Sequence, residues 1–292
     1  MQRITFSTTL ELLKPVTWFA PMWALGCGVV SSGMPVAENW LIVIGGILLA
    51  GPLVCGTSQA VNDWFDRHVD AINEPDRPIP SGRMPGRSGF YVACLWTLLS
   101  LLVAALLGWL VLAAAAVGLV LAWLYSIPPI RLKNNGWLGN LACAICYEGL
   151  PWFTGVAMLT AVLPPDEVLW LALLYSLGAH GIMTLNDFKA VEGDRQMGIR
   201  SLPVQLGERR AALALCATMI VAQVVVSVLL YRWGHPYHGG TIALLIVGQL
   251  ALMPRLLADP VKRAPWFNGT GILLYVIGML VSAFAVRPES VI

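Results

Sequence analysis

The sequence predicts an all-α, polytopic membrane protein with nine transmembrane helices. Three observations predict this class: the apolar composition, nine long apolar stretches, and a one-sided distribution of cations. Of the 292 residues, 58% are hydrophobic and 12% are charged, whereas soluble domains carry about 25% charged residues. The mean hydropathy of +0.73 agrees with this reading. The composition therefore excludes a soluble binding module.

The nine apolar stretches are each close to the length that a spanning helix needs, about 20 residues. Polar turns separate them, and tryptophans stand near several of their ends, as at a membrane interface. In chain order the predicted spans are approximately 16–34, 40–61, 89–107, 109–127, 137–160, 167–186, 210–231, 240–258 and 267–286.

The cations predict the orientation of these spans, because cytoplasmic loops of membrane proteins carry an excess of Lys and Arg. If the N-terminus is cytoplasmic, 16 of the 18 Lys and Arg residues fall on the inner side, and only Arg232 and Arg287 fall outside. The net charge of +2 is thus a signal of orientation, and we expect no nucleic-acid partner. The inner cations are Arg3, Lys14, Arg67, Arg77, Arg83, Arg87, Arg131, Lys133, Lys189, Arg195, Arg200, Arg209, Arg210, Arg255, Lys262 and Arg263.

A charged stretch, NDWFDRHVDAINEPDRPIPSG, interrupts the apolar sequence at residues 62–82 and is called here the first acidic island. If the second span continues as a helix, Asp63, Asp66 and Asp70 stand at i, i+3 and i+7 and form one stripe. Such a stripe could be a solvated face, but a solvated face usually mixes signs. Clustered carboxylates at a membrane surface suit Mg²⁺, which proteins often share with substrate phosphates.

A second acidic island, NDFKAVEGDRQMGIRSLPVQLG at residues 186–207, follows the sixth span. Asp187 and Asp194 stand at i and i+7, and Ala190 occupies the position of the middle acid. Because spans two and six are four apart, we interpret the chain as a single domain, residues 1–292. It would contain two four-helix halves, about 16–136 and 137–258, and a ninth helix at 267–286.

Two facing acidic sites with bound Mg²⁺ would hold a diphosphate, and nearby cations would complete the charge balance. Arginine suits bidentate contacts with phosphate, and lysine acts as a point charge. Some of these cations would serve only as orientation charges. The candidates are Arg77, Arg83, Arg131, Lys133, Lys189, Arg195 and Arg200.

Four ordered motifs resemble the UbiA superfamily of intramembrane prenyltransferases, and within it the chlorophyll and bacteriochlorophyll synthase branch. They are NDxxDxxxD (62–70), NEPxRPIPSG (73–82), YSxPPxRLK (125–133) and NDFKxVEGDRxxGxxSLPV (186–204). The stretches LLKPVTWFAPMW and YEGLPWFTG favour the bacteriochlorophyll side of this branch. The resemblance covers essentially the whole chain.

The resemblance implies nine transmembrane helices around a central cavity, which two cytoplasmic Asp-rich loops cap. It implies a Mg²⁺-dependent transfer of a geranylgeranyl or phytyl group from its diphosphate to the propionate of a chlorophyllide, with bacteriochlorophyllide a as the expected acceptor. The expected location is the bacterial inner, intracytoplasmic photosynthetic membrane, where the partners are lipid and other proteins of pigment synthesis or assembly. The missing acid at Ala190 departs from more acidic versions of the second motif.

The resemblance also carries site residues over by position. The expected metal-binding and catalytic residues are Asp63, Asp66, Asp70, Asp187 and Asp194. The expected substrate-binding residues are Asn62, Asn73, Arg77, Arg83, Tyr125, Arg131, Lys133, Asn186, Lys189 and Arg195.

Two further polar residues lie inside predicted spans, where ionisable groups are expensive and often functional. Glu148 could contact the macrocycle or hydrogen-bond to a neighbouring helix. His180 could ligate the magnesium of the pigment, although a lone histidine is more often a packed, hydrogen-bonded residue. Both are retained as candidate substrate-binding residues.

Three other functions compete with this interpretation. A chlorophyll synthase acting on chlorophyllide a, or a prenyltransferase acting on a quinone or haem, would use the same diphosphate site. A membrane transporter could also have repeated halves and paired acids, but its acids should lie near the bilayer midplane. Here the acids stand at the predicted span ends.

Overall fold

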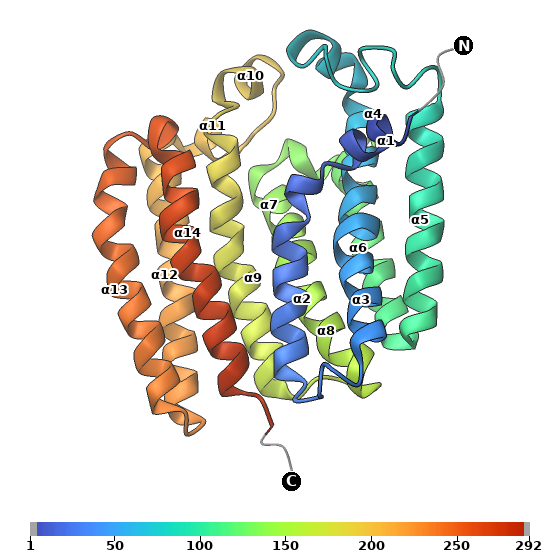
Figure 1. The fold of residues 1–292 in the computed structure, drawn as a ribbon. Coiled ribbons are helices and arrows are strands. Elements are labelled where there is room, and N and C mark those ends of the chain that lie inside the picture. The colour runs from blue at the N-terminus through green and yellow to red at the C-terminus, as the bar shows by residue number, and fades with distance from the viewer. Residues whose placement is uncertain (1–4, 289–292) are drawn as a thin grey trace.

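The computed structural model describes residues 5–288, and the regular secondary structure of this part of the chain is all helical, with no strand. One isolated bridge pairs Asn135 with Arg200. The long helices run side by side as a bundle, and short helices and connecting segments gather at one of its ends (Figure 1). The all-α class that the apolar periodicity predicts is therefore confirmed.

The bundle consists of helices that form all or part of its long segments, and a few short segments connect them. The former are α2 (Phe19–Ser31), α3 (Trp40–Leu48), α4 (Gly56–Asn73), α5 (Ser88–Leu107), α6 (Trp109–Ser126), α7 (Gly136–Ala144), α8 (Leu150–Thr160), α9 (Asp166–Asp187), α12 (Glu208–Arg232), α13 (Pro236–Ala258) and α14 (Pro260–Ala285). The short segments are α1 (Phe6–Leu13), η1 (Pro15–Thr17), η3 (Leu132–Asn134), α10 (Val191–Gln196) and α11 (Leu202–Leu206).

Eight helical segments of residues 5–288 are long and apolar enough to cross a membrane. They correspond to the second to ninth predicted spans. The stretch predicted at 16–34 forms the shorter apolar helix α2 of 13 residues, below the roughly 20 that a full crossing needs. The predicted count of nine spans is therefore not confirmed, although all nine stretches contain helix. The second span extends beyond its predicted end at residue 61, as far as Asn73.

Two of the spans contain a turn of π-helix. The span Trp40–Asn73 joins α3 and α4 through η2 (Leu49–Cys55), which contains Pro52. Proline lacks the N–H that an α-helix requires, and a wider turn accommodates this loss. The span Gly136–Thr160 joins α7 and α8 through η4 (Ile145–Gly149). π-Helical turns are often found at functional sites, so both turns merit attention.

Close helix packing holds α2 against α8. A Cβ atom on Gly28 would lie 2.1 Å from the Trp152 carbonyl oxygen, and one on Gly155 would lie 2.3 Å from the Leu25 carbonyl oxygen. Both distances are far below van der Waals contact, so the two backbones approach as only glycines allow. Small residues at such crossings are typical of helix packing in membranes.

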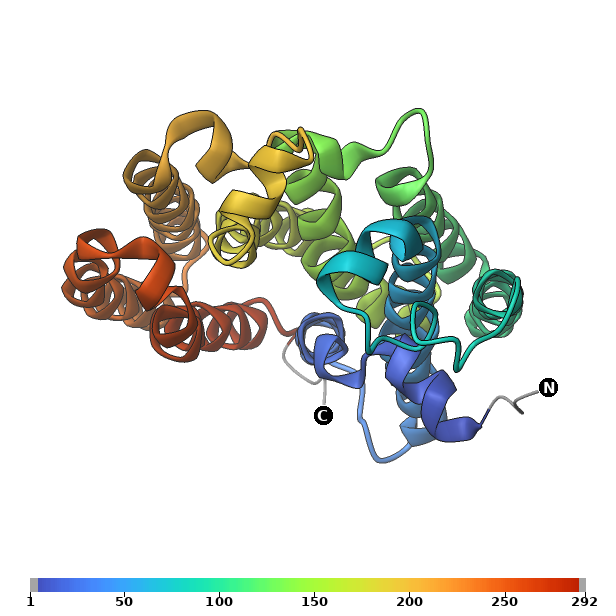
Figure 2. The ribbon, with the colours of Figure 1, turned by 90° about the horizontal axis from the view of Figure 1, so that it is seen from above.

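The apolar core does not separate at the predicted boundary between the halves. The largest buried cluster includes Ala24 of α2, Trp152 of α8 and Tyr175 of α9, together with residues of α12, α13 and α14. A second cluster joins other residues of α2 and α8 to η2, α5 and α6. Seen from above, α12 to α14 lie on one side of the molecule and α4 to α6 on the other (Figure 2). The division into two four-helix halves stays a prediction.

The end of the bundle that bears the last residues of α4 and α9 is called here the acidic end. The short helices α1, α10 and α11 lie at this end, as does the segment after α4 (Figure 1). The turn between α13 and α14 is also there, whereas the end of α12 and the last described residues of the chain lie at the opposite end. The loops predicted on the inner and outer sides thus lie at different ends of the bundle, and the orientation of the bundle in a membrane stays a prediction.

Candidate active site

Three of the four aspartates of the first acidic island, Asp63, Asp66 and Asp70, lie on α4, which continues as a helix through Asn73. Asp63 and Asp70 are buried, with 1% and 7% of their surface exposed, and Asp66 is partly buried. The predicted continuation of the helix is therefore confirmed. The stripe faces protein, so it is not a solvated face.

Four cations neutralise these three aspartates. The Lys14 ammonium lies 2.6 Å from Asp63 Oδ1, and the Arg77 guanidinium lies 3.5 Å from the same oxygen and 2.9 Å from Asp70 Oδ2. Arg131 and Lys133 both pair with Asp66, Arg131 at 2.7 Å. Burial lowers the pKa of Lys133, and the charge of Asp66 opposes this effect.

Two of these cations stand on strained backbone. Lys14 and Arg131 have φ values of +47° and +41°, in the left-handed region that residues other than glycine rarely adopt. In residues 5–288 the only other non-glycine residue with positive φ is Ala161. Such strain is costly and concentrates at functional sites, and here it coincides with the two residues that approach Asp63 and Asp66.

Some acceptor capacity remains on the first island. Asp63 Oδ2 is buried and has no hydrogen-bond partner among the described residues. The Asn62 amide donates to Asp66 Oδ2 at 3.1 Å and to Ser126 Oγ at 3.3 Å. A buried carboxylate oxygen without a hydrogen-bond donor is unusual. Such an oxygen is available to coordinate a divalent cation.

The second acidic island has a different environment. Asp187, at the end of α9, accepts a hydrogen bond of 3.4 Å from the Asn140 amide, which also donates to Thr184 Oγ1 at 3.3 Å. Asp194 on α10 is 8% exposed, and burial raises the pKa of its carboxyl. Neither aspartate forms an ion pair with any residue of the described range.

The segment after α6 links the two islands. It contains Arg131, which binds Asp66, and its next residues pair with the second island: the Arg200 N–H donates to the Asn134 carbonyl at 3.0 Å. The Gly136 N–H donates back to the Arg200 carbonyl at 2.8 Å. The two islands therefore meet through this segment at the acidic end.

Tyr125 lies between the islands as well. Its neighbour Ser126 accepts the hydrogen bond from Asn62, and its ring packs on Gly139, where a Cβ would stand 3.5 Å from it. The next residue of α7 is Asn140, the partner of Asp187. Tyr125 thus lies beside Ser126, which binds Asn62 of the first island, and near Asn140, which binds Asp187 of the second.

The aspartates fit Mg²⁺ through single carboxylates rather than a preformed cage. No group of three or more His, Cys, Asp or Glu side chains in residues 5–288 converges closely enough to hold a metal ion. Mg²⁺, however, usually binds one or two carboxylates and completes its shell with water and substrate phosphates. Asp63 with its free oxygen, and Asp187 and Asp194 without cation partners, satisfy that requirement.

Five of the predicted substrate-binding residues form no hydrogen bond or ion pair with the carboxylates of Asp63, Asp66, Asp70, Asp187 or Asp194 within the described range. Arg83 binds Glu11 instead, at 2.5 and 2.7 Å, and Arg195 pairs with Glu192 at 3.2 Å. The other three are exposed and form no side-chain hydrogen bond or ion pair with another described residue: Asn73, Asn186 and Lys189.

Glu148 and His180 are both buried in the spans. Glu148, on the π-turn η4, is 4% exposed, and its Oε2 has no partner among the described residues. His180 shares a hydrogen bond of 3.0 Å between Nε2 and the Trp137 carbonyl, and its ring stacks on that of Trp137 at 5.6 Å. His180 is therefore partly satisfied by protein, whereas Glu148 is not.

Sequence reasoning missed Lys14 and Asn140 as site residues. Lys14 was counted only as an orientation charge, and Asn140 lies within an apolar span. An amide inside a span is a signal that could have pointed to Asn140, because polar side chains there seek partners. Lys14 offered no such signal, since its partner Asp63 is 49 positions away in sequence.

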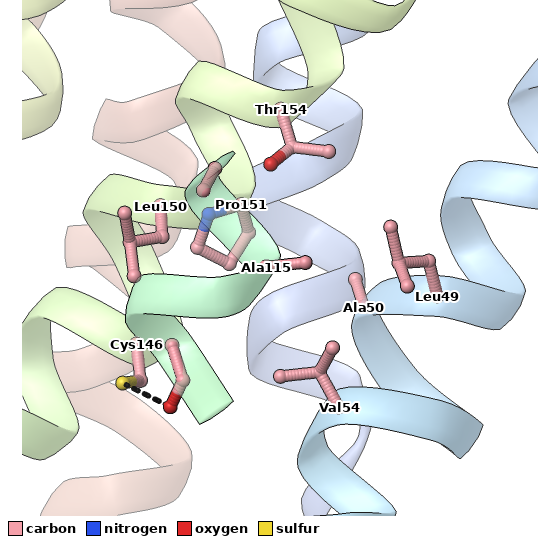
Figure 3. A pocket seen from close by; sticks show the side chains of 10 residues that line it. Leu49, Ala50, Val54, Ala115, Cys146, Leu150, Pro151 and Thr154 are labelled. Atoms are coloured by element: carbon pink, nitrogen blue, oxygen red, sulfur yellow. Dashed lines mark hydrogen bonds between the residues drawn. The ribbon is translucent and has the colours of Figure 1, made fainter. Parts of the chain in front are cut away.

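An apolar crevice of about 30 Å³ lies between η2, α6, η4 and α8. Small and aliphatic side chains line it, among them Ala50, Val54, Ala115 and Leu150 (Figure 3). Cys146 on its wall donates weakly to the Gly118 carbonyl at 3.8 Å. The crevice has room for roughly one water molecule, so a larger apolar group would enter only if neighbouring side chains moved.

Sequence comparison relates the chain to enzymes of pigment synthesis. A model of the UbiA prenyltransferase family matches residues 15–277. The bacteriochlorophyll synthase 33 kDa chain of Cereibacter sphaeroides is 58% identical over 97% of this chain and 94% of that protein. The chloroplastic chlorophyll synthase of Oryza sativa subsp. japonica is 38% identical over 94% of this chain and 76% of that protein.

Solved structures share the fold. A structure of digeranylgeranylglyceryl phosphate synthase matches with a TM-score of 0.74 and 22% identity, over 95% of this chain and 98% of that chain. A UbiA homolog from Archaeoglobus fulgidus bound to GPP and Mg²⁺ matches with a TM-score of 0.68 and 19% identity, over 96% of each chain. At these identities the similarity establishes the arrangement of helices.

Proposed function

Because the chain belongs to the UbiA prenyltransferase family, we propose that it esterifies the propionate of bacteriochlorophyllide a with geranylgeranyl or phytyl diphosphate. The observation that carries this proposal is the 58% identity with a bacteriochlorophyll synthase chain along nearly the whole of both proteins. The lower identity of 38% with a chlorophyll synthase favours the bacteriochlorin as acceptor.

The proposed reaction forms one C–O bond and breaks another. An oxygen of the propionate attacks the allylic carbon of the prenyl chain, and diphosphate leaves with the electron pair of the broken bond. A carboxylic acid with a pKa near 4 to 5 is already ionised at neutral pH, so the attack needs no strong general base. The protein must instead bind the leaving group and exclude water.

The four cations of the first island are suited to the leaving diphosphate. Arg77 and Arg131 offer the planar donor pairs that suit phosphate oxygens, and Lys14 and Lys133 offer point charges. Placed in advance, such groups stabilise negative charge as it develops and do not need to reorganise. They would exchange part of their contact with Asp63, Asp66 and Asp70 for the phosphates.

Mg²⁺ is the metal that we propose for the site, as in the solved homolog with GPP. When bound, it would act as a Lewis acid on the diphosphate. The residues proposed to hold it are Asp63, Asp66 and Asp70 of the first island, and Asp187 and Asp194 of the second. Asn62, Asn73, Asn186, Tyr125, Lys189 and Arg195 are proposed to contact the substrate around it.

We place the acceptor deeper in the membrane than the diphosphate. Glu148 has an unpartnered buried oxygen, which could hydrogen-bond with a polar group of the macrocycle. His180 would need to present the ring nitrogen that does not contact Trp137 in order to ligate the central magnesium. The apolar crevice near Ala115 could widen to take part of the prenyl chain.

The proposed setting is a bacterial inner membrane, including its intracytoplasmic photosynthetic extensions. The acidic end would face the cytoplasm, because 16 of the 18 Lys and Arg residues belong to that side of the predicted topology. The shorter helix α2 would then be the first of nine transmembrane segments around the site. Soluble prenyl diphosphates would reach the acidic end from the cytoplasm.

A membrane assay tests this function. Membranes containing the protein receive Mg²⁺ and geranylgeranyl diphosphate, with bacteriochlorophyllide a or chlorophyllide a in separate reactions, and chromatography follows the ester. We expect ester with bacteriochlorophyllide a, none with excess chelator, and turnover lower by about 10² to 10³ in the variant Asp66→Asn. A preference for chlorophyllide a would make the protein a chlorophyll synthase.

An inactive result has a defined meaning if size-exclusion chromatography shows folded protein. No ester with either pigment would refute pigment esterification and return the search for the acceptor to quinones and haem. Replacing geranylgeranyl by phytyl diphosphate in the same assay identifies the preferred tail, because apolar pockets discriminate weakly between chains that differ in saturation.

A further inference from the structure

The N-terminal helix α1 and the segment after α4, residues 74–87, form a joint cover over the three aspartates of α4. Both lie at the acidic end beside the last turns of α4 (Figures 1 and 2). Their apolar side chains share one cluster, in which Leu12 and Leu13 of α1 pack with Met84 of the segment and with Ala60 and Val61 of α4. The two pieces therefore rest on the same surface.

An ion pair joins the two pieces of the cover. The Arg83 guanidinium donates to both carboxylate oxygens of Glu11, at 2.5 and 2.7 Å, and also to the Asp76 carbonyl. Such a bidentate pair has a defined geometry. The hydrogen bond from Arg83 lowers the pKa of Glu11, so the pair is charged at neutral pH.

Each piece of the cover delivers one cation to the same aspartate. Lys14 directly follows α1 and lies 2.6 Å from Asp63 Oδ1, and Arg77 of the segment lies 3.5 Å from that oxygen. The left-handed backbone of Lys14 caps α1 through a hydrogen bond to the Glu11 carbonyl. The positions of both cations thus depend on where α1 and the segment sit relative to each other.

We propose that Glu11 and Arg83 form a clamp that positions Lys14 and Arg77 for the diphosphate of the prenyl substrate. Glu11 and Arg83 are positioning residues, since neither touches Asp63, Asp66 or Asp70. The inference rests on the proposed function for the identity of the ligand. It assigns Arg83 a different task from direct contact with phosphate.

The clamp is distinguishable from an ordinary surface ion pair. Pairs between exposed side chains add little to stability, and this one is only half-buried. Its effect should therefore appear in substrate binding and in the mobility of residues 74–87, with little change in thermal stability. Reversing both charges should restore the pair, whereas reversing one should bring like charges together.

A charge-reversal cycle tests the clamp in the full-length protein in nanodiscs. The variants are Glu11→Arg, Arg83→Glu and the double variant. Isothermal titration with an unreactive thiodiphosphate analogue of geranylgeranyl diphosphate, in the presence of Mg²⁺, gives Kd, and hydrogen exchange reports on residues 74–87 without substrate. Arg87→Glu is the matched control, because it makes the same charge change in the same segment at an exposed side chain.

We expect each single reversal to raise Kd and KM about tenfold. Both constants should return close to the wild-type values in the double variant, because the ion pair is restored. The kcat at saturation should stay within about twofold of wild type, because a positioning residue acts on binding here. Exchange in residues 74–87 should rise in both single variants and fall back in the double variant. Arg87→Glu should change none of these.

Two failures have different meanings. Wild-type affinity and wild-type exchange in both single variants, or a double variant that shows the sum of the two losses, would refute the clamp. A wild-type protein that is folded but does not bind the analogue would refute the proposed function instead. The exchange measurement separates the two, because it needs no substrate.

Discussion

The two acidic islands begin with the same Asn-Asp pair but have opposite electrostatic environments. In the first island, Lys14, Arg77, Arg131 and Lys133 neutralise the three aspartates. In the second, Asp187 receives only a long hydrogen bond from Asn140, and Asp194 is buried without a cation in the described range.

This difference in charge neutralisation indicates that the two islands are suited to different parts of one ligand. The first island has its cations in place, so it is prepared for a diphosphate anion. The carboxylates of the second island have no cation partner. A divalent cation would therefore gain more electrostatic free energy by binding there than at the first island. If this assignment is correct, substitutions on the two islands should have different effects on turnover, stability and metal requirement.

The largest effect is expected for loss of charge on the first island. Asp66→Asn keeps the shape of the side chain but removes the charge that holds Arg131 and Lys133. We expect turnover to fall by about 10² to 10³, the scale of losing one preorganised electrostatic group. Prenyl ester formation in membranes, with protein quantified by immunoblot, measures this; near-normal turnover would remove Asp66 from the site.

Thermal stability should change in opposite directions on the two islands. Asp66→Asn leaves two cations without their partner and should cost about 1.5–3 kcal/mol. Asp194→Asn removes a buried charge and should raise the melting temperature at pH 7 by about 2–4 °C. Each variant is solubilised in detergent and heated, and size-exclusion chromatography then measures the fraction that remains folded. The melting temperatures obtained in this way test both expectations.

The difference in stability between Asp194→Asn and the wild type should depend on pH, because the pKa of Asp194 is raised. A carboxyl with a raised pKa stabilises the fold fully below its unfolded value, about 3.9, and loses this contribution as the pH rises through its folded value. The advantage of Asp194→Asn should therefore shrink when melting is measured at pH 5. An advantage that grows at low pH would contradict the assignment.

The metal requirement should depend more on the second island. Asp187→Asn removes a carboxylate that no cation neutralises, so it should raise the Mg²⁺ concentration for half-maximal activity about tenfold or more, as loss of a ligand or its orientation does. Titration of activity against Mg²⁺ measures this. The matched control is Glu192→Gln, an exposed acid near Asp194; an equal shift in this control would point to general surface charge.

The smallest effect is expected at Asn140. Asn140→Ala removes a weak hydrogen bond from Asp187, worth about 0.5–1.5 kcal/mol, so the same Mg²⁺ titration should shift only a few-fold. Asn140→Asp would add a charge beside Asp187 and should shift the titration in the opposite direction. If both variants behave like wild type, Asn140 has no part in holding Asp187.

Much of the fold could be read from the chain because hydropathy is a local property. All nine predicted stretches contain helix, and the positions of the charged loops agree with one bundle having two unlike ends. The length of α2 was not predictable from hydropathy, because the turn η1 occupies the start of the apolar stretch and α2 already ends at Ser31, before the predicted end at residue 34.

The candidate site was predictable only in part. The spacing of Asp63, Asp66 and Asp70 predicted a stripe on one helix, since side chains three and four apart share a face. The same reasoning could not tell that Arg131 reaches Asp66 while Arg83 reaches Glu11. Both arginines were candidates of equal standing, and the difference depends on how the segments after α4 and α6 turn.

Local patterns in the sequence identify this protein as a membrane prenyltransferase with two acidic islands. Long apolar stretches and ordered motifs are properties of neighbouring residues and can be recognised without knowledge of the fold. Only the tertiary structure decided how the islands are neutralised. Lys14 and Asp63 are 49 positions apart, and Lys133 and Asp66 are 67 apart. Contacts over such separations follow from helix packing, which brings together residues that no local pattern connects.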